Sequence, residues 1–210
     1  MLSVTSDSGG SGIGDQQNNN SFFDSSSSVT SSTNIFDACK AGDLERVREL
    51  ARGGVDVCRA NDDGWTPMLF ACEEGHMNIV QFLFQNGAKD DVSRPDNDGW
   101  TPMLIACQEG HLDIVQFLFQ NGAEDDIRRP NISGRTPMFA ACRSGHLSIV
   151  QFMCQNGAND DVRRPGVHGK TPVYIACQEG HLNIVQFLCQ NGAKDDVRQP
   201  ANDGTTPMYI

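Results

Sequence analysis

A cysteine and a histidine four residues apart recur along the chain, and these two residue types could serve as a nucleophile and its base. The first pair is Cys72 and His76, and the spacing of 35 residues is kept down to Cys177 and His181. A thiol becomes an effective nucleophile when a neighbouring imidazole removes its proton. However, a glycine lies between the two residues and breaks the helical register, and no acidic residue stands at a fixed spacing to orient the base. We therefore expect the pairs to be structural and the protein not to be an enzyme.

The cysteines also raise the question of a metal centre or a disulfide scaffold. Four of the eight cysteines stand 35 residues apart, at Cys72, Cys107, Cys142 and Cys177. Equivalent positions on stacked helices lie about 8–10 Å apart, whereas a disulfide requires Cα atoms within about 7 Å and zinc requires sulfurs that converge on one ion. We expect these thiols to fill small buried positions, with no metal and no cofactor. Because the first residues show no signal peptide, we expect reduced thiols and a cytoplasmic location, with the nucleus as the other compartment considered.

Paired aspartates form a third repeating feature. They occur at positions 90–91, 125–126, 160–161 and 195–196, and arginines follow each pair. The nearby DNDG stretch at 96–99 could belong to a calcium loop, but the spaced ligands and the terminal glutamate of such a loop are missing. We expect the charges to form exposed ion pairs along the loops, each of which contributes little to stability.

The overall charge argues against two classes of partner. The formal net charge is −11 over 210 residues, whereas a protein that binds nucleic acid needs a basic surface and anionic lipids attract basic segments. No run of apolar residues approaches the length of about 18 that a membrane-spanning helix requires. We expect no binding to nucleic acid and no association with a membrane.

Two short helices in each unit must position these residues. In the first strong copy, Thr66 is a suitable N-cap, and Pro67 follows at the first helical position, where its missing N–H costs nothing. Apolar residues then form one stripe as far as Gly75, which can adopt the left-handed backbone that ends a helix. The second helix, at about 78–86, is apolar on most sides, so it should be sandwiched between the units before and after it. The polar segment 88–100 is long enough to form an extended finger with a tight turn at its tip.

The string TPMLFACEEGHMNIVQFLFQNGA, which starts at Thr66, resembles the ankyrin repeat, whose pattern begins T-P-L-H-x-A and continues through G-H to a second helix and G-A. The resemblance covers residues 34–210 and implies an all-α solenoid of stacked helix-turn-helix repeats with β-hairpin-like finger loops. The expected units are a capping repeat at 34–64, full repeats at 65–99, 100–134, 135–169 and 170–204, and a truncated repeat at 205–210.

The chain departs from the family pattern in two ways. The family's histidine after Thr-Pro-Leu is replaced, so apolar packing should take over from its hydrogen bonds; the residues there are Leu69, Leu104, Phe139 and Tyr174. Each finger is also about two residues longer than in the family's repeat of about 33 residues.

The two ends of the chain differ from the repeats. The second helix of the capping repeat is rich in charge, as a solvent-facing end requires, with Glu45, Arg46, Arg48 and Glu49. Residues 1–33 are rich in Ser, Asn and Gly and cannot bury enough surface to offset their ordering entropy, so we expect a disordered tail. The chain ends at TPMYI, inside an expected first helix, which predicts a fragment of a longer array; a naturally short end is the other reading.

Comparison of the units with one another separates constant from variable positions. The columns of the second helix barely change, whereas the finger tips and the first helix differ between units. We expect the constant positions to be buried by stacking and the variable ones to face solvent. In proteins that the chain resembles, the variable positions line a concave face that grips partner proteins. The partner-binding residues implied here are Trp65, Phe70, Glu73, Glu74, Asp96, Asp98, Trp100, Ile105, Gln108, Glu109, Ile132, Ser133, Arg135, Arg143, Ser144, His168, Lys170, Gln178 and Glu179.

Two properties of this set favour protein recognition. Trp65 and Trp100 stand at adjacent finger tips, and tryptophan is a common interface anchor, although each ring could instead pack on its own turn. The set also grades from acidic at 73–74 to basic at Arg135 and Lys170, and such a gradient can fix the orientation of a partner. We expect a monomeric, non-catalytic scaffold that binds a partner protein; the alternative is a passive spacer or regulatory arm of a larger multidomain protein.

Overall fold

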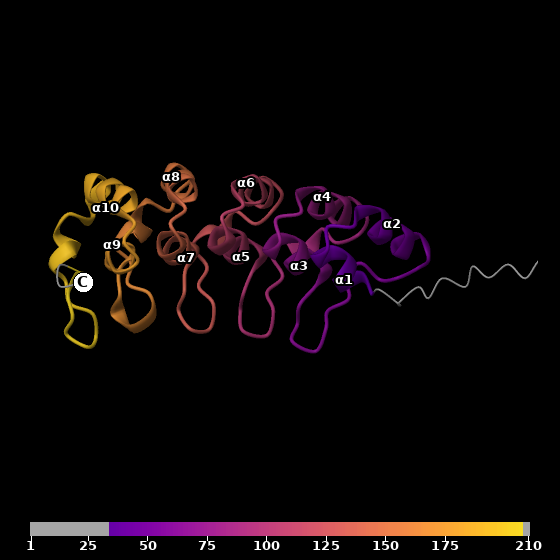
Figure 1. Ribbon diagram of the computed structural model, residues 1–210, viewed down its shortest axis with the longest axis horizontal. Helices are drawn as coiled ribbons and strands as arrows, with labels where there is room; N and C mark the ends of the chain where they lie inside the picture. Colours follow the sequence, from indigo (N-terminus) through magenta and orange to yellow (C-terminus); the bar gives the residue numbers. More distant parts are fainter. Residues whose placement is uncertain (1–33, 208–210) are drawn as a thin grey trace, which may run out of the picture. The chain divides into compact units, whose positions relative to one another are not determined.

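Each of the four full repeats, with its Thr-Pro and Gly-His signals, forms two short helices joined by a tight turn, and the capping repeat forms the same helix pair without these signals (Figure 1). The computed structural model describes residues 34–207, so the expected disordered tail at 1–33 and the last three residues lie outside the described part. The first helices are α1 (Ile35–Lys40), α3 (Pro67–Glu73), α5 (Pro102–Glu109), α7 (Pro137–Ser144) and α9 (Pro172–Gln178). The second helices are α2 (Leu44–Arg52), α4 (Met77–Gln85), α6 (Leu112–Gln120), α8 (Leu147–Gln155) and α10 (Leu182–Leu188). The prediction of an all-α stack of helix pairs is confirmed.

The first helices begin as the sequence predicts. Thr66 Oγ1 accepts a hydrogen bond from the backbone N–H of Leu69 at 3.3 Å, and the three later units repeat this cap. Pro67 and its counterparts occupy the first turn, where a backbone donor is not needed. At the other end of α5, Gly110 adopts a left-handed backbone with φ of 92°. The local signals therefore set both ends of the helix.

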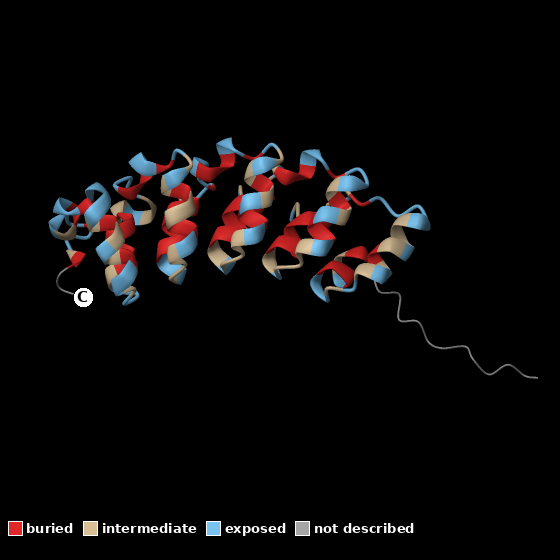
Figure 2. Ribbon diagram, turned by 90° about the horizontal axis from the view of Figure 1, so that it is seen from above, coloured by how far each residue is buried: buried red, intermediate tan, exposed pale blue. Residues whose placement is uncertain are grey.

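The helices form two layers. First helices pack against the first helices of the neighbouring units, second helices pack against second helices, and the fingers extend from the first-helix layer on the side away from the second helices (Figure 1). Buried residues lie along the sides of the helices that face their neighbours (Figure 2). Each interior helix pair therefore has a neighbour on both sides, as the apolar second helix requires.

The core includes the columns that barely vary between units. In α4, Ile79, Val80 and Leu83 are fully buried, and burial of each such side chain stabilises the fold by about 1.5–3 kcal/mol. Aromatic rings join neighbouring second helices, since Phe84 meets Phe117 edge to face with ring centroids 5.4 Å apart. The predicted burial is confirmed for these three positions of α4, whereas Phe82 and Phe84 are half-buried.

The first three finger tips are tight turns, each built on one polar side chain, namely Asn61, Asp96 and Asn131. In the second finger, Oδ1 of Asp96 accepts the backbone N–H groups of Asp98 at 2.9 Å and of Trp100 at 2.8 Å. Neighbouring fingers are also joined, because the Ile132 N–H donates to the carbonyl oxygen of Asp98 at 3.0 Å. No strand is assigned anywhere in 34–207, so the fingers resemble hairpins in their turns without forming a ladder.

Short helical turns interrupt the segments that the sequence indicated as plain loops. They lie in the segment after each second helix, where the repeat is longer than usual, and carry the paired aspartates. These 3₁₀ turns are η1 (Asp90–Val92), η2 (Asp125–Arg128), η3 (Asn159–Val162) and η6 (Asp195–Arg198). A further 3₁₀ turn forms the fourth finger tip at η4 (Val167–Gly169), and a π-type segment follows α10 at η5 (Cys189–Ala193).

Candidate functional site

The candidate site is the surface formed by the finger tips and the exposed residues of the first helices, which we call the finger face. Most of the predicted partner-binding residues have side chains that reach solvent there. The exposed ones are Glu74, Asp98, Glu109, Ile132, Ser133, Arg143, Ser144, His168, Gln178 and Glu179. The half-buried ones are Trp65, Glu73, Trp100, Gln108, Arg135 and Lys170. Their contact with a partner stays a prediction.

Two variable residues do not face solvent, and that expectation is wrong for them. Phe70 is 8% exposed and Ile105 is 3% exposed. The Phe70 ring packs between Trp65, at a centroid distance of 4.9 Å, and Phe36 of the preceding unit, at 5.6 Å. The column is buried even though it varies between units. Asp96 is also buried, because its carboxylate holds the finger turn together.

Both tryptophans of the finger face pack within the protein and remain partly exposed. Trp65 rests on Phe70, and the guanidinium of Arg135 lies 5.1 Å from the Trp100 ring centroid. A cation over an aromatic face contributes about 0.5–1 kcal/mol at an exposed site. Arg135 is held there by a hydrogen bond from its Nη1 to Oε1 of Gln108 at 3.1 Å. The rings are thus held in place before any partner arrives.

The charge on the finger face is divided between its two ends. Burial raises the pKa of Glu73, the charges of Glu74 and Glu109 raise it further and that of Lys40 lowers it, so three carboxylates and one lysine lie near one another at the amino-terminal end. Arg135 and Lys170 lie farther along the array, where they line a common hollow. A partner with opposite charges at its two ends would therefore fit in one orientation.

The finger face includes residues that comparison of the repeats did not find. The Nζ atom of Lys40 lies 4.6 Å from the centroid of the Phe70 ring. Together with Trp65, Glu73 and Asp63 it lines a hollow of about 250 Å³. Lys40 belongs to the capping unit, which lacks the Thr-Pro start, so its residues do not align with the variable columns. Ala38 in α1 and Ala71 in α3 occupy equivalent positions, and their spacing is the signal in the sequence that could have aligned Lys40 with the later units.

The cysteine column is part of the core. Cys72, Cys107 and Cys142 are fully buried, all cysteines of the described part are free thiols, and burial raises the pKa of these three well above the ordinary value. Burial also raises the pKa of Cys39 to about 12. Because the thiolate is the reactive form, these residues are poorly suited to nucleophilic chemistry.

The histidine column links neighbouring units. His111 Nε2 hydrogen-bonds to the carbonyl oxygen of Glu73 at 3.1 Å, and His146 Nε2 does the same to Gln108 at 3.0 Å. In both cases the acceptor lies in the preceding unit, 38 residues earlier in the sequence. Each carbonyl belongs to the last turn of a first helix, where backbone acceptors lack an intrahelical partner. The histidines therefore tie the units together.

The paired aspartates are not exposed ion pairs, and that expectation is corrected. The second aspartate of each pair is buried, and in the later units it pairs with an arginine of the unit before it. Arg128 Nη2 lies 3.0 Å from Oδ1 of Asp161, and Arg163 Nη2 lies 3.0 Å from Oδ1 of Asp196. Both carboxylates are 0% exposed. We call the column of these aspartates, with the residue of the preceding unit that faces each, the Arg–Asp ladder.

The ladder weakens toward the amino-terminal end. Asp126 receives a hydrogen bond from Ser93 Oγ at 2.6 Å in place of an arginine of the preceding unit, and pairs with Arg129 of its own unit at 3.3 Å. In the first rung, that of Asp91, Cys58 occupies the position that the donor residue has in the later rungs. Asp91 accepts from Arg94 of its own unit at 3.4 Å, while its Oδ2 atom is buried without a hydrogen-bond partner. A buried acceptor left unpaired costs about 1–3 kcal/mol.

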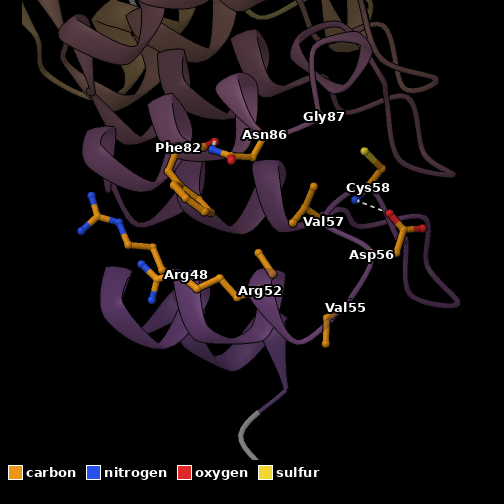
Figure 3. Close-up of a pocket in the computed structure, with 10 residues that line it drawn as sticks. Arg48, Arg52, Val55, Asp56, Val57, Cys58, Phe82, Asn86 and Gly87 are labelled. Atoms are coloured by element: carbon orange, nitrogen blue, oxygen red, sulfur yellow. Dashed lines mark hydrogen bonds between the residues drawn. The ribbon is translucent and has the colours of Figure 1, made fainter.

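There is room beside Cys58 for a longer side chain. A hollow of about 620 Å³ lies between α2 and α4. Figure 3 shows Arg48 on the α2 side, Phe82 on the α4 side and Cys58 at one end. The backbone N–H of Cys58 donates to Oδ1 of Asp56 at 2.9 Å. The charge of Asp91 helps raise the pKa of the Cys58 thiol, which indicates that the two are close.

Cys58→Arg is expected to raise the free energy of unfolding by about 1 kcal/mol at pH 7, because it completes the first rung of the ladder. Burial raises the pKa of Asp91 above its ordinary value. In the wild-type protein the stability linked to this group is therefore fully present below the unfolded pKa of about 3.9 and is lost as the pH rises through the folded pKa. The arginine should remove that loss, so its benefit should be clear at pH 7 and small at pH 3. Urea unfolding followed by circular dichroism measures both.

Cys58→Met is the control for this prediction, because it adds a side chain of intermediate length without a charge. An equal gain from methionine, or a gain from arginine that is the same at pH 3 and pH 7, would contradict the electrostatic account.

Within residues 34–207, no group of three or more His, Cys, Asp or Glu residues could hold a metal ion. None of the helices in this part is both long enough and apolar enough to cross a membrane.

Comparisons with known proteins agree with this architecture. A family model described as ankyrin repeats (3 copies) matches residues 35–131 and 124–201. Protein phosphatase 1 regulatory subunit 27 of Mus musculus is 35% identical over 57 residues, which are 27% of this chain and 37% of that protein. Myotrophin of Xenopus tropicalis is 43% identical over 51 residues, 24% of this chain and 43% of that protein. Ankyrin repeat domain-containing protein 40 of Mus musculus is 40% identical over 53 residues, 25% of this chain and 15% of that protein. The chain thus spans less than half the length of each of these relatives.

Proposed function

The chain belongs to the ankyrin repeat family, and from this premise we propose that it is a non-catalytic scaffold that binds a partner protein through its finger tips and first helices. Ankyrin repeats generally mediate protein–protein interaction. One relative is named as a regulatory subunit of protein phosphatase 1, which is a role carried out by binding another protein. We propose a cytoplasmic location and a monomeric array of one capping repeat and four full repeats.

The proposal is carried by the contrast between the two layers. The second-helix columns are nearly constant and fill the core, whereas most residues that differ between units reach solvent on the finger face. Residues that differ between units without affecting the stacking can serve to recognise a partner. The half-exposed tryptophans and the separated charges provide the kinds of contact that dominate interfaces: a rigid aromatic anchor and a directional electrostatic match.

A second candidate function keeps the same fold. The array could be a spacer or a regulatory arm within a larger protein, in which the finger face binds nothing. The hydrogen bonds and ion pairs between units favour this reading in part, because they join the units into a continuous stack. It predicts that substitutions on the finger face leave all binding unchanged.

The double substitution Trp65→Ala with Trp100→Ala is expected to weaken partner binding at least tenfold without unfolding the array. Loss of a central aromatic anchor typically costs about 2 kcal/mol or more. The partner would first be identified by cross-linking and mass spectrometry from native extract. The dissociation constant would then be measured with the purified partner, and the fold checked by circular dichroism.

Phe82→Ala with Phe117→Ala is the matched control, because it removes two half-buried aromatic rings from the second-helix layer. We expect that variant to lose stability but to keep partner affinity. Unchanged affinity in the tryptophan variant would count against the finger face and favour the spacer.

A further inference from the structure

Three basic residues converge on a hollow of about 250 Å³ at the carboxy-terminal end of the finger face. Arg135 stands at the start of the third full unit and Arg143 in the last turn of its first helix, α7, while Lys170 comes from the fourth finger. Phe139 and Ile175, both buried, line the hollow with apolar surface. The hollow therefore combines three cations with two apolar side chains, in a lining that is polar for the larger part.

None of these three cations forms an ion pair within residues 34–207, although hydrogen bonds from Thr205 and, to a smaller extent, the charge of Lys170 lower the pKa of Asp203. The ion pairs of residues 34–207 join arginines to aspartates or glutamates elsewhere, and none of them includes Arg135, Arg143 or Lys170. Lys170 instead donates to the neutral amide of Gln178 at 2.7 Å. One acidic residue, Glu179, lines the hollow, and its carboxylate accepts from the Gln178 amide at 3.1 Å.

Arg135 shows the lack of compensation most clearly. Its Nε atom is buried and has no hydrogen-bond partner, although its Nη1 reaches Gln108. A buried donor without an acceptor is unusual and costs free energy. Burial and the charge of Arg143 both lower the pKa of Arg135. An anion in the hollow would relieve the repulsion between the two guanidinium groups.

We propose that the hollow binds carboxylate side chains of an acidic segment of the partner protein. Arginine binds carboxylates through paired N–H donors, and such charge-assisted hydrogen bonds are about twice as strong as neutral ones. The volume suits one or two side chains rather than an extended polyanion, and the net charge of −11 opposes a nucleic acid. This inference rests on the proposed function, because it names the chemistry that the finger face would recognise.

The test uses the full 210-residue chain and a fluorescein-labelled decapeptide with three glutamates flanked by leucines, measured by fluorescence anisotropy. A second peptide has glutamine in place of each glutamate, and a third has phosphoserine. We expect saturable binding of the glutamate peptide with a dissociation constant below about 1 mM, at least tenfold weaker binding of the glutamine peptide, and weakening by added salt.

Arg143→Gln with Lys170→Gln is expected to weaken binding of the glutamate peptide at least tenfold. Lys194→Gln with Arg198→Gln is the matched control, since both residues are exposed, lie outside the hollow and carry the same total charge. Thermal unfolding checks that both variants fold.

Equal binding of the glutamate and glutamine peptides, equal effects of the two double variants, or no saturable binding would overturn the proposal. Phosphoserine binding more than tenfold tighter than glutamate binding would also overturn it and assign the hollow to phosphopeptides. None of these results depends on the binding test with the tryptophan variant. The proposal for the hollow can therefore fail while the proposal that the finger face binds a partner still holds, and the two outcomes are distinguishable.

Discussion

Gly110→Ala is expected to destabilise the array by about 3–4 kcal/mol, through a left-handed backbone, a steric clash and a lost tie between units. Gly110 has φ of +92°, and a left-handed conformation costs a non-glycine residue about 1–2 kcal/mol. A Cβ atom there would lie 2.7 Å from Nδ1 and 2.8 Å from Nε2 of His146. The ring must move, so its bond to the Gln108 carbonyl, with a net contribution of about 0.5–1.5 kcal/mol, is lost or strained. Urea unfolding measures the loss.

Gly180→Ala provides a position-matched control for this effect. Gly180 follows α9 as Gly110 follows α5, and its φ of +78° is similar, but a Cβ atom there would meet nothing within 4 Å. We expect this variant to lose only the backbone cost, about 1–2 kcal/mol. If both variants lost the same free energy, the histidine contact would have no energetic role, and the account of how units are joined would be wrong.

Arg128→Met is expected to destabilise the array by about 2–3 kcal/mol, because it leaves the carboxylate of Asp161 buried with little compensation. Removing one partner of a buried ion pair costs about 3–5 kcal/mol. The cost should be smaller here because the Arg128 side chain is 44% exposed and Arg164 Nη1 remains 3.8 Å from the carboxylate. Adding Asp161→Asn should recover at least half of the loss, since the uncompensated charge is then gone.

Arg48→Met is the comparison for the ladder variant. Arg48 and Glu45 form an ion pair at 2.6 Å whose side chains are 39% and 71% exposed. Exposed pairs of this kind contribute about 0.3–0.5 kcal/mol. A loss in Arg128→Met no greater than that in Arg48→Met would show that burial of the aspartate does not matter to the ladder.

The parts of the fold that the sequence predicted are those set by local signals. Thr66 followed by Pro67 marks a helix start wherever it occurs, because capping depends on residues within one turn. The burial of Ile79 and Leu83 followed from a second helix too apolar to have one neighbour. Stacking was predictable from the repeat itself, since identical apolar faces must be covered by adjacent units.

The ties between units were beyond sequence reasoning because their partners are far apart in the chain. Arg128 follows Asp126 in the sequence, which made a local exposed pair the natural interpretation, yet its partner is Asp161. His111 likewise bonds to a carbonyl 38 residues earlier. Backbone acceptors carry no mark in the sequence, and the depth of an aspartate depends on how the neighbouring unit covers it.

Variation between units also proved an incomplete guide to exposure. Phe70 changes to other residues in later units and was therefore assigned to the surface, but it is buried under Trp65. A position can vary because the residues that cover it vary as well. The same comparison correctly indicated exposed side chains for Arg143 and Glu179, which have no large side chain packed over them.

The constant register of these ties has a consequence for how such a chain can change in length. Every histidine bond, every rung and every finger contact joins a residue to one about a single period away. An in-frame tandem duplication of residues 100–134 would give the new segment a matching acceptor on one flank and a matching donor on the other. A duplication of this kind in the gene could thus lengthen the array without any compensating mutation. Each added repeat would also bring a further finger tip, whose residues selection could then change.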